Sequence, residues 1–483
     1  MLKLLRAGIG TRVIHSDFIE AIRSVVGDDN LILDKLALEY YSTDAFGKWR
    51  EPHLNLETYP VFAVVRPGTT EQVAEIVKLA CVQSVSLMPY GGGTGVMGAL
   101  NPSDGTVAVD MKNISVIENI NVEDMTVTVG SGVILGDLDV ALGRHGLMLG
   151  HDPYSVPIAT VGGAISTNGV GYRAAKYGSM GDQVLGLEIV LPTGQIIETR
   201  AVAKTSAGPS LHRLFIGSEG VFGIITRATL RVFRIPETRI FQVVDFQTFE
   251  DGFHAMSELF SLDLKPALVD LTEEPDQGLE GALQKWKTTM YLVFEGFVEE
   301  VEAQLVRTLK VCIKWNGEDV GPDLARNYWD TRHDSAYRYK ERYIDDNSAR
   351  SITRRSQAST AYPHVALSPS RILEYRKFCH DVAIKRKLNV REYSLWTRPE
   401  LFSIILVDMF VDSEEESNQL AEGVDEILKM AQDLGGSMEY VHGVGVKLVH
   451  LLPRELGASM ELLKNIKLAI DPNRIMNPGN LNL

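Results

Sequence analysis

One segment decides the fold, and it reads Tyr90-Gly91-Gly92-Gly93-Thr94-Gly95-Val96-Met97-Gly98. Residues 93–98 fit the pattern GxGxxG and follow a strand-like run at 85–88, as in Rossmann dinucleotide-binding sites. A Rossmann loop must open a helix that receives a pyrophosphate at its N-terminus, but residues 101–105, Asn-Pro-Ser-Asp-Gly, break helices. We therefore reject a Rossmann fold. The glycines remain suited to binding a phosphate, because N–H groups without neighbouring Cβ atoms can point into one concavity.

Two more segments rich in glycine and other small residues follow along the chain. Residues 152–171 contain Ala-Thr-Val-Gly-Gly at 159–163 and Asn-Gly at 168–169, and residues 217–226 read Gly-Ser-Glu-Gly-Val-Phe-Gly-Ile-Ile-Thr. Small residues, hydroxyls and an amide let a chain run close beside a flat ring and hydrogen-bond its edge. One such segment is most simply a tight turn. Three in this order within one domain predict a ligand site instead.

The order of the three segments resembles a known group of flavoproteins. GGGT, then ATVGG with Asn-Gly downstream, then GSEG-x-x-GI-I-T is similar to the FAD-binding domain of the vanillyl-alcohol-oxidase/para-cresol-methylhydroxylase (PCMH) type. The branch with D-lactate dehydrogenase, the glycolate oxidase flavin subunit, D-2-hydroxyglutarate dehydrogenase and alkyldihydroxyacetonephosphate synthase is the most similar. The resemblance implies that FAD is bound by Tyr90, Gly91, Gly92, Gly93, Thr94, Gly95, Asp152, Thr160, Gly162, Gly163, Ser166, Asn168, Gly171, Glu219 and Ile225.

Thr94 bears on how the flavin is held. Some members of the family attach FAD covalently through a histidine in or near the first glycine loop. In this chain Thr94 follows the glycines, and the loop contains no histidine. We therefore expect FAD to be bound non-covalently.

Three zones of different composition predict the domain organisation. Residues up to 236 are rich in glycine and short β-branched strands, such as Val61–Val65 and Val107–Asp110, with a helix expected over Thr70–Ala80 and Thr70 as its N-cap. Residues 237–430 alternate helical and strand-like patterns, including a strand at Phe402–Phe410. We expect an α+β protein. Its parts are a PCMH-type FAD-binding domain of two α+β subdomains at 1–236 (core about 55–236), a substrate or cap domain with an antiparallel sheet at 237–430, and a segment at 431–483 that returns to the FAD-binding domain.

Three residues are candidates for the reacting end of the site. Oxidation of an alcohol by a flavin needs a base for the hydroxyl proton and a cation for any substrate carboxylate. His442, in His-Gly-Val-Gly, resembles the family's HGIG/HGVG histidine, and a histidine is suited to proton transfer. Arg332 resembles a Trp-x-x-Arg element that binds a substrate carboxylate or phosphate, and a guanidinium forks onto two oxygens. Tyr362 lies where the 2-hydroxy-acid branch has a strand that enters the active site.

Each candidate has a structural alternative. His442 is otherwise a buried structural histidine, and Tyr362 is otherwise a packed aromatic side chain. Arg332 is otherwise a surface arginine. Its competitors nearby are Arg338, Arg342, Arg354 and Arg355.

Two departures from the family narrow the chemistry. The D-2-hydroxyglutarate-type enzymes carry an H-x-G-D-G-N-x-H segment that supplies metal ligands, whereas the stretch near Phe402–Phe410 has no histidine, so we expect no metal. The ether-lipid synthase has three histidines before its GVG and a tyrosine on the preceding strand. Here the run is Tyr440-Val441-His442 and the strand has no tyrosine, with Tyr440 open as a substitute.

These patterns lead to one main function and several alternatives. The main expectation is FAD-dependent oxidation of a small 2-hydroxy acid, similar to D-lactate or glycolate, or of a related alcohol, by hydride transfer to flavin N5. The alternatives are an ether-lipid enzyme similar to alkyldihydroxyacetonephosphate synthase, a phenolic-alcohol oxidase, and a non-catalytic flavin subunit of a larger complex. The electron acceptor is open among oxygen, a quinone and a redox protein, and a homodimer is one candidate assembly.

The bulk composition disfavours other classes of protein. A formal net charge of −15 without a basic patch argues against nucleic-acid and anionic-membrane binding. The three cysteines are far apart and lack CxxC spacing, which argues against iron–sulfur clusters, zinc ribbons and a disulfide framework. No run approaches the roughly 20 apolar residues of a membrane span, and Met1–Arg6 lacks a signal-peptide pattern. We therefore expect a cytoplasmic protein.

Overall fold

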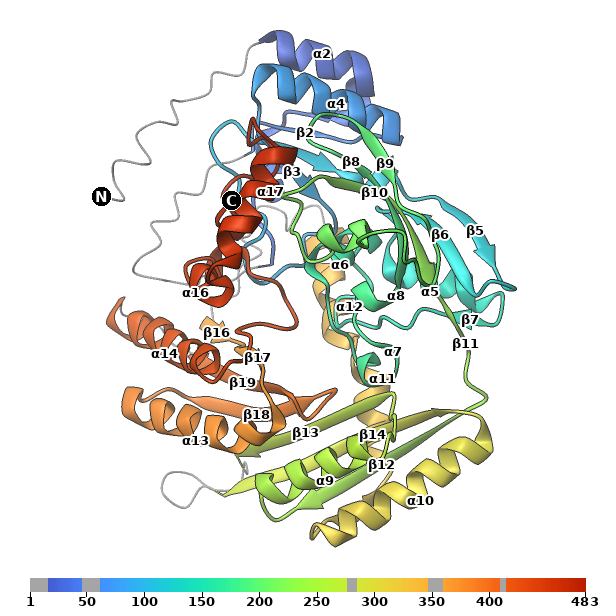
Figure 1. Cartoon of the computed structure of the whole chain (residues 1–483), viewed down its shortest axis with the longest axis vertical. Coiled ribbons are helices and arrows are strands. Elements are labelled where there is room, and N and C mark those ends of the chain that lie inside the picture. The colour runs from blue at the N-terminus through green and yellow to red at the C-terminus, as the bar shows by residue number, and fades with distance from the viewer. Residues whose placement is uncertain (1–15, 46–60, 276–284, 346–358, 409–413) are drawn as a thin grey trace.

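The computed structural model describes residues 16–45, 61–275, 285–345, 359–408 and 414–483. An N-terminal part with two main sheets lies above a large third sheet, as Figure 1 shows. Some residues named in the sequence analysis lie outside the described residues: Met1–Arg6, Arg354, Arg355 and Met409–Phe410.

The first sheet has four strands in the order β1-β2-β4-β3, with β2, β4 and β3 parallel and β1 antiparallel at one edge. Its three parallel strands are mainly apolar and mostly buried, as parallel sheets covered on both faces require, whereas the edge strand β1 is only partly buried. The elements are α2 (Ser16–Val26), η1 (Asp28–Asn30), β1 (Leu31–Ile32), α3 (Lys35–Tyr41), β2 (Ala63–Val65), α4 (Thr70–Gln83), β3 (Leu87–Tyr90), β4 (Val107–Asp110) and η2 (Met111–Asn113).

The second sheet is antiparallel and has the order β5-β6-β10-β8-β9. The short helix α6 runs beside it, begins after the N-cap Thr160 and ends at Asn168, which adopts a left-handed backbone with φ 52°. A separate pair joins β7 to β11. The elements are β5 (Ile117–Asn121), β6 (Thr126–Gly130), α5 (Leu135–Gly143), β7 (Leu147–Met148), α6 (Val161–Thr167), α7 (Ala174–Tyr177), α8 (Met180–Gln183), β8 (Val184–Val190), β9 (Ile196–Glu198), η3 (Leu211–Leu214), β10 (Ile224–Arg231) and β11 (Phe233–Arg234).

The third sheet, named the cap sheet here, is antiparallel in the order β15-β12-β14-β13-β18-β19-β16, and β17 also pairs with β19. Helices α9 and α10 pack against its lower side in Figure 1, whereas α11 and α7 contact it from the side of the N-terminal part. The elements are β12 (Thr238–Phe246), α9 (Phe249–Ser261), β13 (Leu268–Pro275), β14 (Trp286–Gly296), α10 (Val298–Lys314), β15 (Glu318–Gly321), α11 (Asp323–Thr331), α12 (Asp334–Lys340), η5 (Glu341–Asp345), β16 (Ser359–Ala361), β17 (His364–Ala366), α13 (Pro369–Arg386), β18 (Val390–Trp396), β19 (Leu401–Asp408) and α14 (Glu414–Asp433).

The C-terminal segment runs from the cap sheet back to the first sheet, where it lies beside β3 in Figure 1. Leu87 of β3 donates its N–H to the carbonyl of Ile475 at 2.7 Å and accepts the N–H of Asn477 at 2.8 Å. The buried Lys467 donates to the carbonyl of Val221 at 2.7 Å, which fixes the third glycine segment to the same region. The elements are α15 (Gly445–Leu448), α16 (Leu452–Leu456), α17 (Ser459–Ile470) and η7 (Asn480–Asn482).

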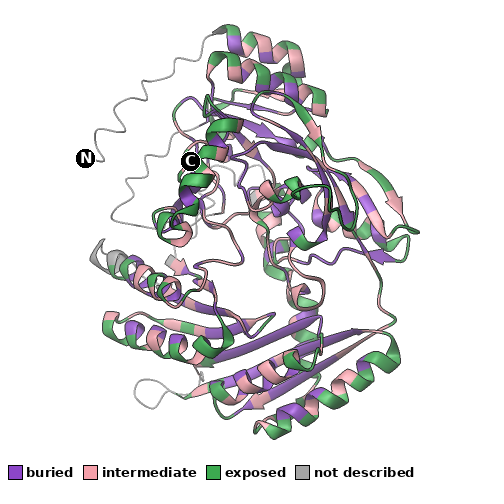
Figure 2. Cartoon of the chain, in the orientation of Figure 1, coloured by how far each residue is buried: buried purple, intermediate pink, exposed green. Residues whose placement is uncertain are grey.

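The expected elements are present with shifted ends. β4 spans the expected Val107–Asp110, whereas β2 starts at Ala63 rather than Val61. The N-cap of α4 is Thr69 and not Thr70, because the Thr69 hydroxyl accepts the N–H of Gln72 at 3.2 Å. Figure 2 shows strands that are mostly buried and outer helices with one buried and one exposed face, as amphipathic periodicity predicts.

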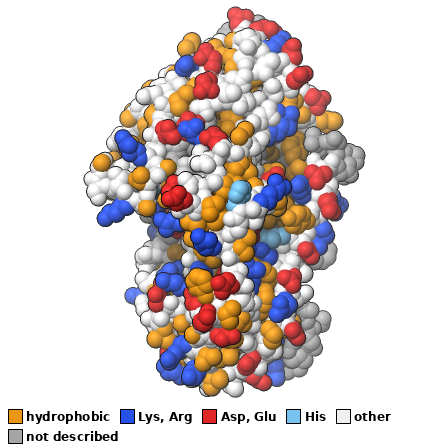
Figure 3. Space-filling model, turned by 90° about the vertical axis from the view of Figure 1, so that its right-hand side faces the viewer, with side chains coloured by type: hydrophobic (Ala, Val, Ile, Leu, Met, Phe, Trp, Pro, Cys, Tyr) orange, Lys and Arg blue, Asp and Glu red, His pale blue; other side chains and the backbone are white. Residues whose placement is uncertain are grey.

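The surface mixes charges of both signs. On the face in Figure 3, acidic and basic side chains are interspersed, and the visible histidines lie near its middle among hydrophobic side chains. None of the helices within the described ranges is long and apolar enough to cross a bilayer.

Candidate functional site

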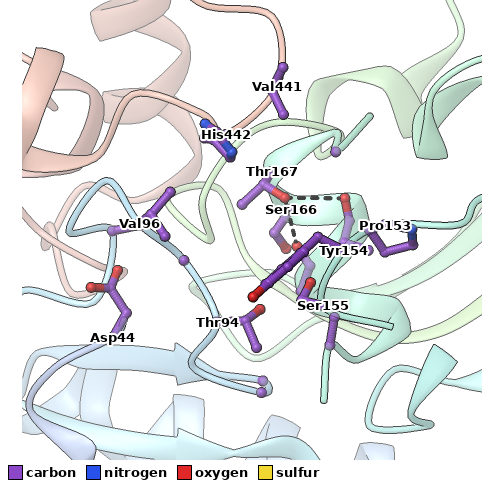
Figure 4. A pocket seen from close by; sticks show the side chains of 18 of the residues that line it. Asp44, Thr94, Val96, Pro153, Tyr154, Ser155, Ser166, Thr167, Val441 and His442 are labelled. Atoms are coloured by element: carbon purple, nitrogen blue, oxygen red, sulfur yellow. Dashed lines mark hydrogen bonds between the residues drawn. The ribbon is translucent and has the colours of Figure 1, made fainter. Parts of the chain in front are cut away.

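A cavity of about 680 Å³ lies where the N-terminal part, the cap sheet and the C-terminal segment meet. All three glycine segments and the His442 loop contribute to its walls. Figure 4 shows Thr94 on the first glycine loop, Ser166 and Thr167 on α6, and His442 on the C-terminal loop around one open space, with the Tyr154 ring reaching into it. Residues as far apart in the sequence as Asp44 and Asn477 therefore line one cavity.

The first two glycine segments touch each other without room for side chains. A Cβ on Gly91 would lie 2.5 Å from Thr160 Oγ1, and one on Gly92 would overlap the carbonyl oxygen of Ile158 and lie 3.1 Å from its carbonyl carbon. Thr160 also caps α6 by accepting the N–H of Gly163 at 3.3 Å. This close approach is the reason for glycine at both positions.

The backbone of the first loop is open toward the cavity. Within the described chain, Gly91 to Thr94 donate no backbone–backbone hydrogen bond, and all four residues line the cavity. These N–H groups are therefore placed to donate to an anionic or acceptor-rich ligand in the cavity.

The third segment holds the His442 loop in place through the buried Glu219. Its Oε1 accepts the N–H groups of Val444 at 2.6 Å and Gly445 at 3.0 Å, and its Oε2 accepts from Asn480 at 3.2 Å. Burial raises the pKa of Glu219, although these hydrogen bonds lower it in part. The absent Cβ of Gly443 would lie 2.7 Å from Oε1, so the loop and the carboxylate fit closely.

Removal of the Glu219 carboxylate should therefore displace His442. We expect Glu219→Ala to slow flavin reduction by about 10²-fold, because displacements near 1 Å at a reacting group have effects of that size. Glu219→Gln, which retains one acceptor oxygen, should recover much of the rate. Stopped-flow reduction of FAD-saturated protein measures this, and equal rates in the wild type and Glu219→Ala would contradict the positioning role.

The structure places most predicted cofactor residues in the cavity wall. Those that line it are Tyr90, Gly91, Gly92, Gly93, Thr94, Gly95, Thr160, Gly162, Gly163, Ser166, Glu219 and Ile225. Asp152, Asn168 and Gly171 do not line it. The side chain of Asn168 instead accepts the N–H of Gly181 at 3.0 Å, and a Cβ on Gly171 would meet the backbone of Asp152 at 2.6 Å. These three residues support the second segment from behind.

Asp152 is the centre of a buried ion-pair cluster. Its Oδ2 accepts from Arg332 Nε at 3.0 Å and lies 3.6 Å from Arg173 Nε, and its Oδ1 lies 2.8 Å from His333 Nε2. Burial alone would raise the pKa of Asp152, but the hydrogen bond to His333 and the charges of Arg173 and Arg332 outweigh it and hold the pKa well below its usual range. The cluster joins the second segment to α11 and the residues after it.

We expect Asp152→Asn to destabilise the fold by about 3–5 kcal/mol at neutral pH, because it leaves buried cations unpaired. A carboxyl group whose pKa is lower in the folded than in the unfolded state stabilises the fold at pH values above its unfolded pKa, about 3.9. This stabilisation is lost as the pH falls toward the folded pKa. The difference in melting temperature from the wild type should therefore be largest near pH 7 and shrink below about pH 4. Asp263→Asn at an exposed site is the control. A difference that is constant from pH 3 to pH 7 would contradict the charge role.

The structure does not bring Arg332 to the cavity. Its guanidinium binds Asp152 and the carbonyl of Trp329, lies 4.0 Å from the centre of the Trp329 ring, and is not part of the cavity wall. The Trp-x-x-Arg spacing is explained by this stacking. The expected carboxylate anchor is thus engaged in holding the fold together.

His442 does line the cavity, and a second histidine, His364 of β17, lies beside it with the ring centres 4.9 Å apart. Burial and then the charge of Lys447 lower the pKa of His442 to about 3, so its ring is neutral at physiological pH. Burial, the neighbouring His442 and Lys447 also lower the pKa of His364. Within the described chain, His442 Nδ1 is buried without a hydrogen-bond partner. It is therefore available to a ligand.

Tyr362 also lines the cavity and stacks on His364 with parallel rings 6.4 Å apart. Behind them, His364 Nδ1 lies 2.5 Å from Ser403 Oγ, which is 2.9 Å from the Tyr440 hydroxyl. Tyr440 itself is not in the cavity wall. The hydrogen-bonded chain orients the His364 ring.

Sequence reasoning missed several residues of the cap-sheet wall: Asp270, Tyr328, His364, Glu392, Ser394, Trp396 and Ser403. Two signals were present. Tyr362 and His364 are two residues apart on an extended segment, so they share a face. Asp270 is a charged residue within the apolar run Ala267–Leu271, and a charge in such a run is rare unless it is functional or paired.

Comparison with known proteins agrees with this architecture. Residues 61–200 match the family described as FAD binding domain, and residues 235–481 match the family described as FAD linked oxidases, C-terminal domain. The second match alone spans slightly more than half of the chain, so the chain belongs to the FAD-linked oxidases. The predicted superfamily, the FAD cofactor and the oxidoreductase class are thereby confirmed.

Individual proteins show the same relationship. The chain is 28% identical over 477 residues to glycolate oxidase subunit GlcD of Bacillus subtilis (strain 168), which covers 97% of each chain. It superposes on alkyldihydroxyacetonephosphate synthase with a TM-score of 0.76 at 20% identity, covering 97% of this chain and 87% of that one. It superposes on p-cresol methylhydroxylase with substrate bound with a TM-score of 0.74 at 18% identity, covering 97% and 96%. The predicted PCMH-type α+β fold is confirmed.

The cavity wall fits the chemistry of FAD. The volume lies within the range of small-molecule and cofactor sites, and the glycine loop offers free N–H groups for phosphate oxygens. Ser131 Oγ and His151 Nδ1 also belong to lining residues and are buried without partners within the described chain. A ligand with several acceptors and donors along its length would satisfy these atoms. Among the described residues, no cluster of His, Cys, Asp or Glu is placed to hold a metal.

Proposed function

We propose that this chain oxidises the CH–OH group of a small hydroxylated substrate, with His442 as the base that accepts the hydroxyl proton. The observation that carries the proposal is a neutral imidazole in the cavity wall whose buried Nδ1 has no partner within the described chain. A base must be unprotonated and within reach of its substrate, and His442 meets the first condition across the physiological pH range.

FAD, when bound, supplies the acceptor for the hydride that leaves the carbinol carbon. The protein residues do the rest. His442 Nδ1 would take the hydroxyl proton, and His364 and Tyr362 would confine the substrate beside it.

The proposed substrate is an alcohol. A 2-hydroxy acid is one candidate, because the chain is similar to glycolate oxidase subunit GlcD. The expected carboxylate anchor, Arg332, does not reach the cavity, so the structure gives the hydroxy-acid class no separate support. An ether-lipid synthase activity is less favoured, because Tyr440 is bonded to Ser403 outside the cavity wall.

An anaerobic survey tests the proposal. FAD-loaded protein would be mixed with D- and L-hydroxy acids, polyols, amino alcohols, phenolic alcohols and an acylated dihydroxyacetone phosphate, and the visible flavin band recorded. Bleaching by an alcohol supports the proposal. Turnover of the acylated phosphate without bleaching would replace it with synthase chemistry. Oxygen, a quinone or a redox protein added afterwards would identify the acceptor.

The same preparation tests how FAD is held. Acid precipitation should leave the yellow colour in the supernatant, because the first glycine loop carries Thr94 and no histidine. A yellow pellet would contradict non-covalent binding.

A further inference from the structure

The wall of the cavity that belongs to the cap sheet is acidic. Asp270 on β13 and Glu392 on β18 both line it. No lysine or arginine side chain among the described residues lines the cavity. Its two other lining carboxylates, Asp44 and Glu219, belong to the N-terminal part. The end of the cavity at the cap sheet therefore offers hydrogen-bond acceptors and no fixed positive charge.

Asp270 has one satisfied and one unsatisfied oxygen. Its Oδ2 accepts the Tyr328 hydroxyl at 2.8 Å, whereas Oδ1 is buried and has no partner within the described chain. The residue is only 7% exposed. Burial and then the charge of Glu392 raise its pKa. A buried carboxyl oxygen without a donor is unfavourable, and a donor on a ligand would remove that penalty.

Glu392 adds to the same environment. Burial raises its pKa, and its hydrogen-bonded neighbours are Ser394, which lowers the pKa, and Glu274, which raises it. The charge of the adjacent Arg391 also lowers the pKa of Glu392, although Arg391 itself is exposed and is not part of the cavity wall. Where Asp270 or Glu392 is ionised, a carboxylate on a ligand would place a like charge beside it, and repulsion would weaken binding of that ligand.

Aromatic rings enclose this acidic end. Tyr172 packs edge to face against Tyr328 at 6.0 Å and against Trp396 at 5.8 Å, and all three line the cavity. Such rings contact the carbon skeleton of a polyhydroxylated compound, and they also stabilise a cation over their faces. Carboxyl oxygens surrounded by aromatic rings suit either kind of hydrogen-bond donor.

We propose that Asp270, with Glu392 beside it, forms a subsite for hydrogen-bond donors on the non-reacting end of the substrate. The donors are the hydroxyls of a polyol or the ammonium of an amino alcohol, and a carboxylate is disfavoured there. This assignment rests on the proposed alcohol oxidation and specifies its substrate class.

Calorimetry on the FAD-loaded protein tests the subsite with three probes: xylitol, 3-amino-1,2-propanediol and D-lactate. We expect xylitol or the amino alcohol to bind at least 10-fold more tightly than D-lactate. If the donor is an ammonium, its affinity should fall with added salt, whereas binding of xylitol should not. Equal or tighter binding of D-lactate, or no binding of any probe, would overturn the subsite.

Two near-isosteric variants assign the effect to the residues. Asp270→Asn should weaken binding of the preferred probe about 10-fold or more, and Glu392→Gln should weaken it less, because Glu392 is only half-buried. Asp245→Asn, on the cap sheet but outside the cavity wall, is the matched control. Unchanged affinity in both cavity variants would overturn the assignment even if the preference among probes holds.

The binding and bleaching experiments can contradict the subsite and the oxidation independently. If the preferred probe binds through Asp270 but no alcohol bleaches the flavin, the proposed function fails and the subsite stands. If D-lactate or glycolate bleaches the flavin faster than the donor probes, the oxidation stands and the subsite falls.

Discussion

Replacing His442 with alanine is expected to slow reduction of the bound flavin by about 10²–10⁴-fold, the usual contribution of a positioned general base. FAD should remain bound with an unchanged visible spectrum, because the glycine loops that form the cofactor cradle are not altered. Anaerobic stopped-flow measurement of the flavin band, with the best substrate from the survey, gives the rate of reduction directly.

The control for this experiment is His254→Ala, which removes a partly exposed histidine on α9 outside the cavity wall. It should leave the rate unchanged. Since burial and Lys447 hold the pKa of His442 at about 3, the wild-type rate should also show no inflection near the ordinary histidine pKa, about 6.5. Full activity in His442→Ala would remove it from the mechanism, and an inflection near pH 6.5 that disappears in the variant would contradict its neutral state.

Replacing Gly92 with alanine is expected to weaken FAD binding by about one to two orders of magnitude. The new Cβ would overlap the carbonyl oxygen of Ile158 and lie 3.1 Å from the carbonyl carbon, and backbone atoms cannot rotate away as a side chain can. The first two glycine segments must then separate. Overpacking of this kind costs about 1–3 kcal/mol, which corresponds to a rise in the FAD Kd of roughly 5- to 150-fold if it falls on the cofactor site.

Titration of FAD into apoprotein, followed by flavin fluorescence, measures this Kd. Gly143→Ala in α5 is the matched control, since a Cβ there meets nothing within 4 Å. Circular dichroism would show that Gly92→Ala still folds. A folded, yellow Gly92→Ala protein with wild-type affinity would mean that the contact between the two loops does not shape the site.

The cofactor half of the site could be predicted because its determinants are local. Gly91 and Gly92 are glycines for a reason that acts within a few residues, and helix breakers after the loop exclude a Rossmann fold without knowledge of distant contacts. The resemblance of these motifs to the flavoprotein family therefore located twelve of the lining residues. Asn168 and Gly171 lie in the same glycine-rich segment, but they pack behind the cavity wall and do not line it. Only the tertiary structure distinguishes these two roles.

The substrate half could not be predicted in the same way, because long-range contacts decide it. Arg332 was expected to face a substrate, but its partner is Asp152, 180 residues earlier in the chain. Asp270 reaches the cavity through its position on β13 within the antiparallel cap sheet, beside β18. No short stretch of sequence predicts the Arg332–Asp152 contact or the pairing of β13 with β18, since the order of strands in a sheet is not encoded locally.

We propose that the FAD-loaded protein takes a hydride from the CH–OH carbon of an alcohol, with His442 taking the proton. The most direct measurement is anaerobic mixing of FAD-loaded protein with the best alcohol of the survey and with the same alcohol deuterated at the carbinol carbon. We predict loss of the visible flavin band with both, more slowly with the deuterated alcohol. A flavin that dithionite bleaches but no alcohol bleaches would contradict the account.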